Sequence, residues 1–348
     1  MCGRCRIRIV VTPESLRRRH VRGHALANDA HGTGPPVRSL KVSACSPGNR
    51  HADHRTFVKA LSSDVVDSRR MSDDYANHRR ETASGISYVD VGTGPPTLFV
   101  HGLLTNGRLW RNCFRLLADQ RRCIAVDLPG QGHTPPIIDH PTVWTWADAV
   151  TELIDELGLD QVHLVGNNTG GAVVQVVMAQ HTNRIASCVL TNCDTEGNYP
   201  PPRFKPAVPA SRLHLFRLAR PLLQRTLVRR WILSAGYENA SAVPDDVVAD
   251  YFNPVFGSPA ATAAMERFLT SCSDDVLADI HDQLAACHVP TLIVWGTGDL
   301  LFSPRWSRWL RDLIPGVSKI VEIDHGRLYF VDERADELVD AMRKHWES

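Results

Sequence analysis

The chain of 348 residues is predicted to be an α/β protein, with a mostly parallel, doubly wound sheet of eight strands and an inserted helical cap. Short apolar runs of strand length recur between residues 97 and 323, and helical patterns separate most of them. This alternation is typical of a parallel sheet that helices cover on both faces. Between residues 192 and 290 the strand runs stop and only helical patterns occur, which indicates the cap.

The most informative segment is a glycine-rich turn that joins a strand pattern to a helix pattern. Residues 162–165, apolar except for His163, precede the turn, and residues 172–178, apolar except for Gln175, follow it. We expect a sharp bend with Asn168 at its apex. Gly166 and Gly170 remove the Cβ atoms that would collide between strand and helix. The turn reads Gly166-Asn167-Asn168-Thr169-Gly170-Gly171.

Four other strand runs end in turns that carry glycine and polar residues. Because these turns follow strands, they are places where side chains are held at the edge of a sheet. The four segments, each a strand run followed by its turn, are Thr97-Leu98-Phe99-Val100 with His101-Gly102-Leu103-Leu104, Cys123-Ile124-Ala125-Val126 with Asp127-Leu128-Pro129-Gly130-Gln131-Gly132, Thr291-Leu292-Ile293-Val294-Trp295 with Gly296-Thr297-Gly298-Asp299, and Lys319-Ile320-Val321-Glu322-Ile323 with Asp324-His325-Gly326-Arg327-Leu328.

These motifs resemble the α/β-hydrolase superfamily over about residues 85–346, and most of all its haloalkane-dehalogenase branch. The similarity is carried by the glycine-rich turn, by the phrase Leu109-Trp110-Arg111-Asn112, and by the turn that ends at Asp299. The resemblance implies an α/β-hydrolase fold in which the glycine-rich turn is the nucleophile elbow. It places Asn168 at the nucleophile position and Asp299 at the acid position. It assigns the oxyanion hole to the backbone N–H groups of Leu103 and Thr169.

Four residues depart from the dehalogenase pattern. Asn168 stands where that branch has an aspartate, and an amide is too weak a nucleophile to displace a halide or open an epoxide. Thr169 and Leu103 replace the tryptophan and asparagine that hold the leaving halide. Leu328 occupies the position of the catalytic histidine. The sequence therefore does not support a halide-binding site.

The base and the acid each have an alternative. His325 precedes Leu328 by three residues, and a shifted loop would bring it over Asn168 as a base; the other interpretation is a solvated loop histidine. Asp299 is either the acid or a group that caps its own turn. Some dehalogenases place the acid after the strand that here spans residues 186–192. Asp194 and Glu196 are the alternative acids there, unless they hydrogen-bond the loop that leads into the cap.

Three hypotheses for Asn168 remain open. The protein is a hydrolase in which Asn168 orients a water molecule, with His325 or another group as base. Alternatively, Asn168 deamidates to aspartate. In the third hypothesis the site is catalytically silent, and the protein is a pseudoenzyme or a ligand binder. The expected substrate or ligand is a small apolar molecule, such as an ester, an epoxide or a haloalkane-like compound, and no cofactor or metal ion is implied.

Composition indicates the domain boundaries and argues against a nucleic-acid partner. Residues 1–70 are rich in Lys and Arg, although the whole chain has a net charge of only +1. We expect this segment to be a disordered basic extension, with Met71 as the true start. Its only aromatic residue is Phe57, which argues against nucleic-acid binding. We expect the hydrolase core to comprise residues 71–194 and 289–348, and the cap residues 195–288.

No apolar stretch approaches the ~20 residues of a membrane span, and no membrane partner is expected. The nine cysteines have no regular spacing, which indicates reduced thiols in a cytoplasmic protein. Cys2 and Cys5 form a single C-x-x-C pair, too little for a zinc site. The sequence carries no signal for the oligomeric state.

Overall fold

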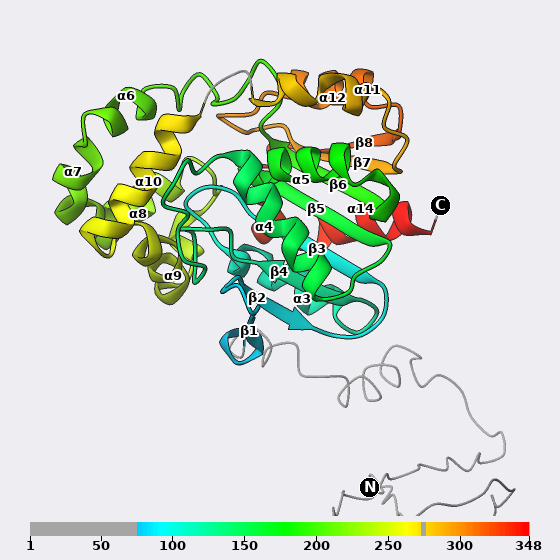
Figure 1. The fold of residues 1–348 in the computed structure, drawn as a ribbon, viewed down its shortest axis with the longest axis horizontal. Coiled ribbons are helices and arrows are strands. Elements are labelled where there is room, and N and C mark those ends of the chain that lie inside the picture. The colour runs from blue at the N-terminus through cyan, green and yellow to red at the C-terminus, as the bar shows by residue number, and fades with distance from the viewer. Residues whose placement is uncertain (1–74, 273–275, 348) are drawn as a thin grey trace, which may run out of the picture. The chain divides into compact units, whose positions relative to one another are not determined.

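The computed structural model describes residues 75–272 and 276–347. The expected extension, Met71 and the Cys2–Cys5 pair lie outside these residues. The centre is an eight-stranded sheet in the order β1-β2-β4-β3-β5-β6-β7-β8 (Figure 1). The strands are β1 Arg79–Glu81, β2 Ser87–Val91, β3 Pro96–Val100, β4 Arg122–Val126, β5 Val162–Asn168, β6 Ile185–Cys193, β7 Thr291–Gly296 and β8 Val317–Ile323.

The pairing of the strands confirms the predicted fold class. β1 pairs with β2, and β2 with β4, in antiparallel fashion. All the other pairs, from β4 through β3 and β5 to β8, are parallel. The central strands are buried along almost their whole length, which explains why they are continuous apolar runs instead of alternating ones.

Helices cover both faces of this sheet. α4 and α5 pack together on one face, and α3 and α14 pack together on the other. The edge strand β8 packs against α12. The helices and 3-10 turns of this layer are η2 Tyr75–His78, η3 Gly107–Trp110, α3 Arg111–Leu117, α4 Val143–Glu156, α5 Thr169–Gln180, η4 Thr182–Arg184, α12 Arg305–Leu313, α13 Phe330–Glu333 and α14 Ala335–Trp346.

The segment between β6 and β7 is helical, as predicted (Figure 1). His214, which has a left-handed backbone conformation with φ of 57°, directly precedes the helix over residues 215–223. The elements of this segment are α6 Ala207–Arg212, α7 Leu215–Leu223, α8 Thr226–Leu233, η5 Ala240–Ala242, α9 Asp245–Phe256, α10 Pro259–Ser271, η7 Ala278–Ile280 and α11 His281–Ala285.

Three expectations from composition bear on the described residues. In the range 75–272 and 276–347, every helix is too short or too polar to cross a lipid bilayer. The cysteines of these residues are all unpaired and buried, as reduced thiols would be. No cluster of three or more metal-binding side chains occurs in the same part of the chain.

Candidate functional site

Asn168 is the last residue of β5 and lies at a sharp bend before α5. Its φ of 57° and ψ of −133° are unfavourable for a residue with a Cβ atom, and such strain persists only where the surroundings enforce it. The neighbouring turns are packed closely around the bend. A Cβ atom at Gly102 would overlap with Cβ of Asn168, and one at Gly170 would overlap with the carbonyl oxygen of His101. The bend predicted at Asn168 is therefore present, and the His101-Gly102 turn presses against it.

The carboxamide of Asn168 is almost completely buried and is fixed by its neighbours. Its Oδ1 atom accepts hydrogen bonds from the backbone N of Thr169 at 2.7 Å and from Thr169 Oγ1 at 3.3 Å. One of the two N–H groups predicted to form an oxyanion hole is therefore already donated to Asn168.

Thr169 connects Asn168 to a buried carboxyl group. Its hydroxyl donates to Asp194 Oδ2 at 2.9 Å, and Gln175 Nε2 donates to the Asp194 carbonyl at 2.8 Å. Burial raises the pKa of Asp194 to about 7, although the Thr169 hydrogen bond opposes the shift. Among the described residues, the second carboxyl oxygen, Oδ1, has no hydrogen-bond partner. Asp194 is thus poised between its protonated and ionised forms near neutral pH.

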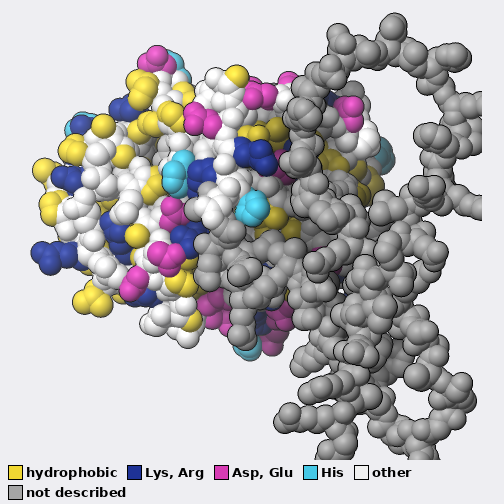
Figure 2. Space-filling model, turned by 90° about the horizontal axis from the view of Figure 1, so that it is seen from below, with side chains coloured by type: hydrophobic (Ala, Val, Ile, Leu, Met, Phe, Trp, Pro, Cys, Tyr) yellow, Lys and Arg dark blue, Asp and Glu magenta, His cyan; other side chains and the backbone are white. Residues whose placement is uncertain are grey.

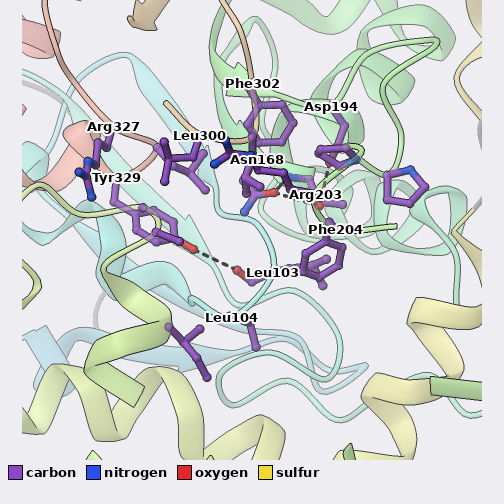
Figure 3. A pocket seen from close by; sticks show the side chains of 18 of the residues that line it. Leu103, Leu104, Asn168, Asp194, Arg203, Phe204, Leu300, Phe302, Arg327 and Tyr329 are labelled. Atoms are coloured by element: carbon purple, nitrogen blue, oxygen red, sulfur yellow. Dashed lines mark hydrogen bonds between the residues drawn. The ribbon is translucent and has the colours of Figure 1, made fainter. Parts of the chain in front are cut away.

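Tyr329 extends this polar group on the other side of Asn168. Its hydroxyl donates to the carbonyl oxygen of Leu103 at 3.5 Å (Figure 3). Burial raises the pKa of the Tyr329 hydroxyl, and the neighbouring Asn168 side chain partly opposes that shift. The Tyr329 backbone N donates to the carbonyl of Gly236 in the β6–β7 segment at 2.8 Å. Hydrogen bonds therefore link Asp194, Thr169 and Asn168, and Tyr329 lines the same cavity.

Asn168, Thr169, Asp194 and Tyr329 form part of the wall of a cavity of about 640 Å³ (Figure 3). Most of the other lining residues are apolar, and they come both from the turns after the strands and from the β6–β7 segment. Arg203 and Arg327 are the cationic residues of the lining, and none of the described lining residues is a histidine. Apolar lining residues include Phe204, Ile232, Leu233, Leu301, Phe302 and Leu328.

Asp299, the residue predicted at the acid position, is bonded to its own turn. Its Oδ1 atom accepts from the backbone N of Leu301 at 2.6 Å and of Phe302 at 3.2 Å, and Oδ2 accepts from Asn192 Nδ2 at 2.8 Å. Burial raises the pKa of Asp299 to about 6, against these hydrogen bonds. Asp299 is not among the residues that line the cavity, and its contacts are those of the turn-capping alternative.

The hypothesis of a shifted base at His325 is not supported by its position. The His325 side chain is 86% exposed and lies 3.5 Å from Asp324 Oδ2. Its backbone N donates to Thr297 Oγ1 at 2.9 Å, which fixes the loop with the ring in solvent. Leu328 is instead the buried residue of this loop that lines the cavity. Its carbonyl accepts from Asn167 Nδ2 at 3.0 Å.

The two alternative acids, Asp194 and Glu196, also differ in whether they line the cavity. Glu196 lies 2.6 Å from His281 Nδ1 and is not part of the cavity lining, whereas Asp194 is. Of the two alternative acids, Asp194 lines the cavity, whereas Glu196 pairs with His281, the first residue of α11.

His101 is a second histidine close to the bend, and its role is structural. Its Nε2 atom accepts from the backbone N of Leu128 at 2.9 Å, and Nδ1 lies 2.8 Å from the carbonyl of Gly102. Burial lowers the pKa of His101 to about 4, so the ring is neutral. Because both ring nitrogens are used, His101 joins two turns and has no nitrogen left for a substrate.

Sequence reasoning did not identify Tyr329 as a site residue. No local motif marks it. Its place next to Leu328, in the loop where the resemblance puts the catalytic histidine, is the only signal in the sequence.

Comparison with known proteins agrees with this architecture. A family model described as alpha/beta hydrolase fold matches residues 95–334. A Mycobacterium tuberculosis protein named haloalkane dehalogenase 2 is 27% identical over 279 residues, which cover 74% of this chain and 90% of that protein. An alpha/beta hydrolase fold protein from Burkholderia ambifaria has a TM-score of 0.67 at 22% identity, covering 76% of this chain and 96% of the other. A thermophilic esterase from Thermogutta terrifontis has a TM-score of 0.61 at 23% identity, covering 77% and 98%.

Proposed function

This chain belongs to the alpha/beta hydrolase fold family, and we propose that it is a hydrolase of small apolar esters or epoxides that uses Asp194 as its general base. In this proposal Asn168 occupies the nucleophile position without forming a covalent intermediate, since an amide is a poor nucleophile. Leu328 stands in place of the catalytic histidine. A carboxyl group therefore has to take the proton that an imidazole takes elsewhere.

The observation that carries the proposal is the free oxygen of Asp194. A buried carboxyl group with a pKa near 7 is matched to proton transfer at neutral pH. Its Oδ1 atom has no partner among the described residues, and Asp194 lines the same cavity as Asn168. Thr169 holds the other carboxyl oxygen, so the orientation of the base is fixed before a substrate arrives.

The reaction follows from these positions. A water molecule held by the Asn168 carboxamide gives its proton to Asp194 Oδ1 while its oxygen attacks the ester carbonyl carbon. The carbonyl oxygen, negatively charged in the intermediate, accepts a hydrogen bond from the Leu103 N–H. The Tyr329 hydroxyl supplies a second one by turning from the Leu103 carbonyl, to which it donates without substrate. The bond to the leaving alkoxide then breaks, and Asp194 returns the proton to it. In an epoxide, the same attack opens a carbon–oxygen bond of the ring.

The cavity also limits the substrate. Its volume of about 640 Å³ falls in the range of small-molecule sites, and an apolar lining favours an apolar substrate. Haloalkanes are left out of the proposal, because Leu103 has an apolar side chain and the Thr169 hydroxyl is engaged by Asp194. The name of the mycobacterial relative therefore does not transfer to this chain.

We also propose that residues 195–288 act as a cap on a core of residues 71–194 and 289–348. The support for this is that Phe204 and Leu233 of the segment line the cavity. The last helix of this segment, α11, packs against α5 of the core.

The test is a pair of carboxyl variants. Asp194→Asn keeps the shape of the side chain and the hydrogen bond from Thr169 but removes the base. We expect kcat for a short-chain p-nitrophenyl ester and for styrene oxide to fall about 10²- to 10⁴-fold. Glu196→Gln, the matched change at the carboxyl group outside the cavity, leaves kcat within about twofold. Equal rates for wild type and Asp194→Asn contradict the proposal.

A catalytically silent ligand binder is the second candidate, and one observation favours it. The Asn168 oxygen and the Thr169 hydroxyl already bond each other or Asp194, so the polar groups at the cavity wall satisfy one another without a substrate. In that case wild type and Asp194→Asn both lack turnover, while calorimetry still detects binding of an apolar substrate analogue.

A further inference from the structure

The β6–β7 segment exposes large apolar side chains close to the cavity. Six of the eight exposed large hydrophobic residues of the described chain lie between residues 213 and 231. Isolated exposed apolar residues are ordinary, but a concentration of them on neighbouring elements marks a binding surface. The residues are Leu213, Leu215, Leu218, Leu222, Leu227 and Trp231, with exposed fractions of 67%, 45%, 76%, 58%, 83% and 75%.

The exposed apolar side chains of α7 and α8 lie on helix faces that the rest of the protein does not cover. On α7, Leu215, Leu218 and Leu222 share one side of the helix, at spacings of three and four residues. Phe216 and Leu223 are the α7 residues that pack against the core. The apolar face of α7 is therefore wider than the face that the rest of the protein covers. On α8, Leu227 and Trp231 share a face in the same way.

The same stretch is strongly cationic. Residues 203–230 contain eight Lys or Arg and no Asp or Glu. Two of these arginines bind carboxylates of neighbouring helices, Arg217 with Glu266 and Arg230 with Asp245. For Arg212, Arg220 and Arg225, the described part of the chain provides no carboxylate partner. Figure 2 shows Lys or Arg and hydrophobic side chains interspersed at the end of the molecule that carries these helices in Figure 1.

We propose that this surface binds the interface of an anionic lipid bilayer. The α7–α8 surface comprises Leu213, Leu215, Leu218, Leu222, Leu227 and Trp231 with Arg212, Arg220 and Arg225. Leucine and tryptophan side chains enter the boundary between headgroups and acyl chains, while the arginines bind lipid phosphates. This is peripheral binding, without a membrane span, and it revises the expectation that the protein has no membrane partner.

The charge pattern favours a lipid surface over a second copy of the chain. A two-fold dimer through the α7–α8 surface brings the same patch onto itself, so each cluster of arginines meets its own copy. The centres of protein interfaces are also depleted in charged residues. An anionic bilayer instead supplies negative charge and apolar depth at the same place.

The position of the surface suggests what the docking is for. Trp231 is 75% exposed and also lines the cavity, so the α7–α8 surface is continuous with the cavity wall. A docked protein therefore presents its cavity to the bilayer, and a lipophilic substrate passes from lipid to Asn168 without crossing water. The delivery step depends on the proposed hydrolase function, whereas the docking does not.

Vesicle co-sedimentation of the full chain tests the docking. We expect wild type to bind vesicles of phosphatidylcholine mixed with phosphatidylglycerol much more strongly than vesicles of phosphatidylcholine alone. Leu218→Ser/Leu222→Ser lowers the partition coefficient on anionic vesicles on the order of tenfold, and Arg212→Gln/Arg225→Gln does the same through the lost charge. Substitutions at such exposed positions leave the fold intact, which circular dichroism verifies.

Matched controls separate this surface from the rest of the chain. Ile138→Ser changes another exposed apolar residue, 58% accessible, and Arg80→Gln/Arg115→Gln removes two exposed cations from the core; both retain wild-type partitioning. Equal losses in these controls, or no preference of wild type for anionic vesicles, overturn the proposal. So does a dimer in analytical ultracentrifugation that Leu218→Ser/Leu222→Ser dissociates. Because the readout is binding, an inactive enzyme that still partitions contradicts only the proposed function.

Discussion

The two halves of the sheet edge around Asn168 carry polar residues of very different use. On the β5–β6 side, hydrogen bonds join Asn168, Thr169 and Asp194, and these three buried residues line the cavity. On the β7–β8 side, where the family resemblance puts the acid and the histidine, Asp299 is bonded to its own turn and His325 lies in solvent. The comparison teaches that the carboxyl group that reaches the cavity follows β6, whereas Asp299 and His325 do not line it.

The largest effect is expected when a nucleophile is introduced at residue 168 and a histidine is introduced in the loop after β8. In Asn168→Asp/Leu328→His, a carboxylate nucleophile faces an imidazole from the buried position of the loop. We expect ester or haloalkane turnover to rise on the order of 10³-fold over wild type, since the members of a nucleophilic triad act as a unit. Steady-state kinetics and trapping of a covalent adduct by mass spectrometry measure it.

The single variant Asn168→Asp is the control for that experiment. If it equals the double variant, a histidine at 328 is unnecessary and the β5–β6 side alone supports the chemistry. Peptide mapping of the wild type at residue 168 belongs to the same experiment, because a gain of one dalton there reveals deamidation, the hypothesis in which Asn168 becomes an aspartate unaided.

The pH dependence sharpens the comparison further. Because Asp194 acts as a base only when ionised, and burial raises its pKa to about 7, the hydrolysis rate increases as the pH rises through 7 and levels off above it. The stability changes in the opposite direction. The folded protein keeps the proton that the unfolded chain releases near the ordinary value of 3.8, so the free energy of unfolding decreases between pH 4 and 7.

Asp194→Asn separates this contribution from that of Asp299, whose pKa is raised to about 6. The Tm of the variant exceeds that of wild type at pH 8, and the difference shrinks toward pH 4. Differential scanning calorimetry across this range checks the prediction. A Tm difference that does not vary with pH shows that Asp194 has an ordinary pKa, and the assignment of the base then fails.

The smallest effect is expected at His325. Because its ring is exposed and lies 3.5 Å from Asp324 Oδ2, His325→Ala leaves kcat and KM for the ester substrate within about twofold of wild type. A loss of more than about tenfold indicates that the loop moves in solution and brings the imidazole over Asn168.

The sequence predicted the central strands and the bend at Asn168, but it did not predict the strands at the β1–β2 edge of the sheet. Continuous apolar runs mark β3, β5, β6 and β7, because helices on both sides exclude polar residues. The short antiparallel strands β1 and β2 were not identified, since half-exposed edge strands have mixed composition. α4 was also not identified, although the reciprocal capping bonds between Thr142 and Thr145 leave a trace in the sequence.

The composition and spacing of the chain alone determined the fold class and placed an amide at the apex of a strained turn, because both follow from local patterns of apolar residues and glycines. Only the tertiary structure decided which acid reaches the cavity and that His325 does not, because these outcomes depend on how loops distant in the sequence are held. Glu196 is drawn away by His281, and His325 is fixed by Thr297. Such partners act through space, and no spacing within a motif encodes them.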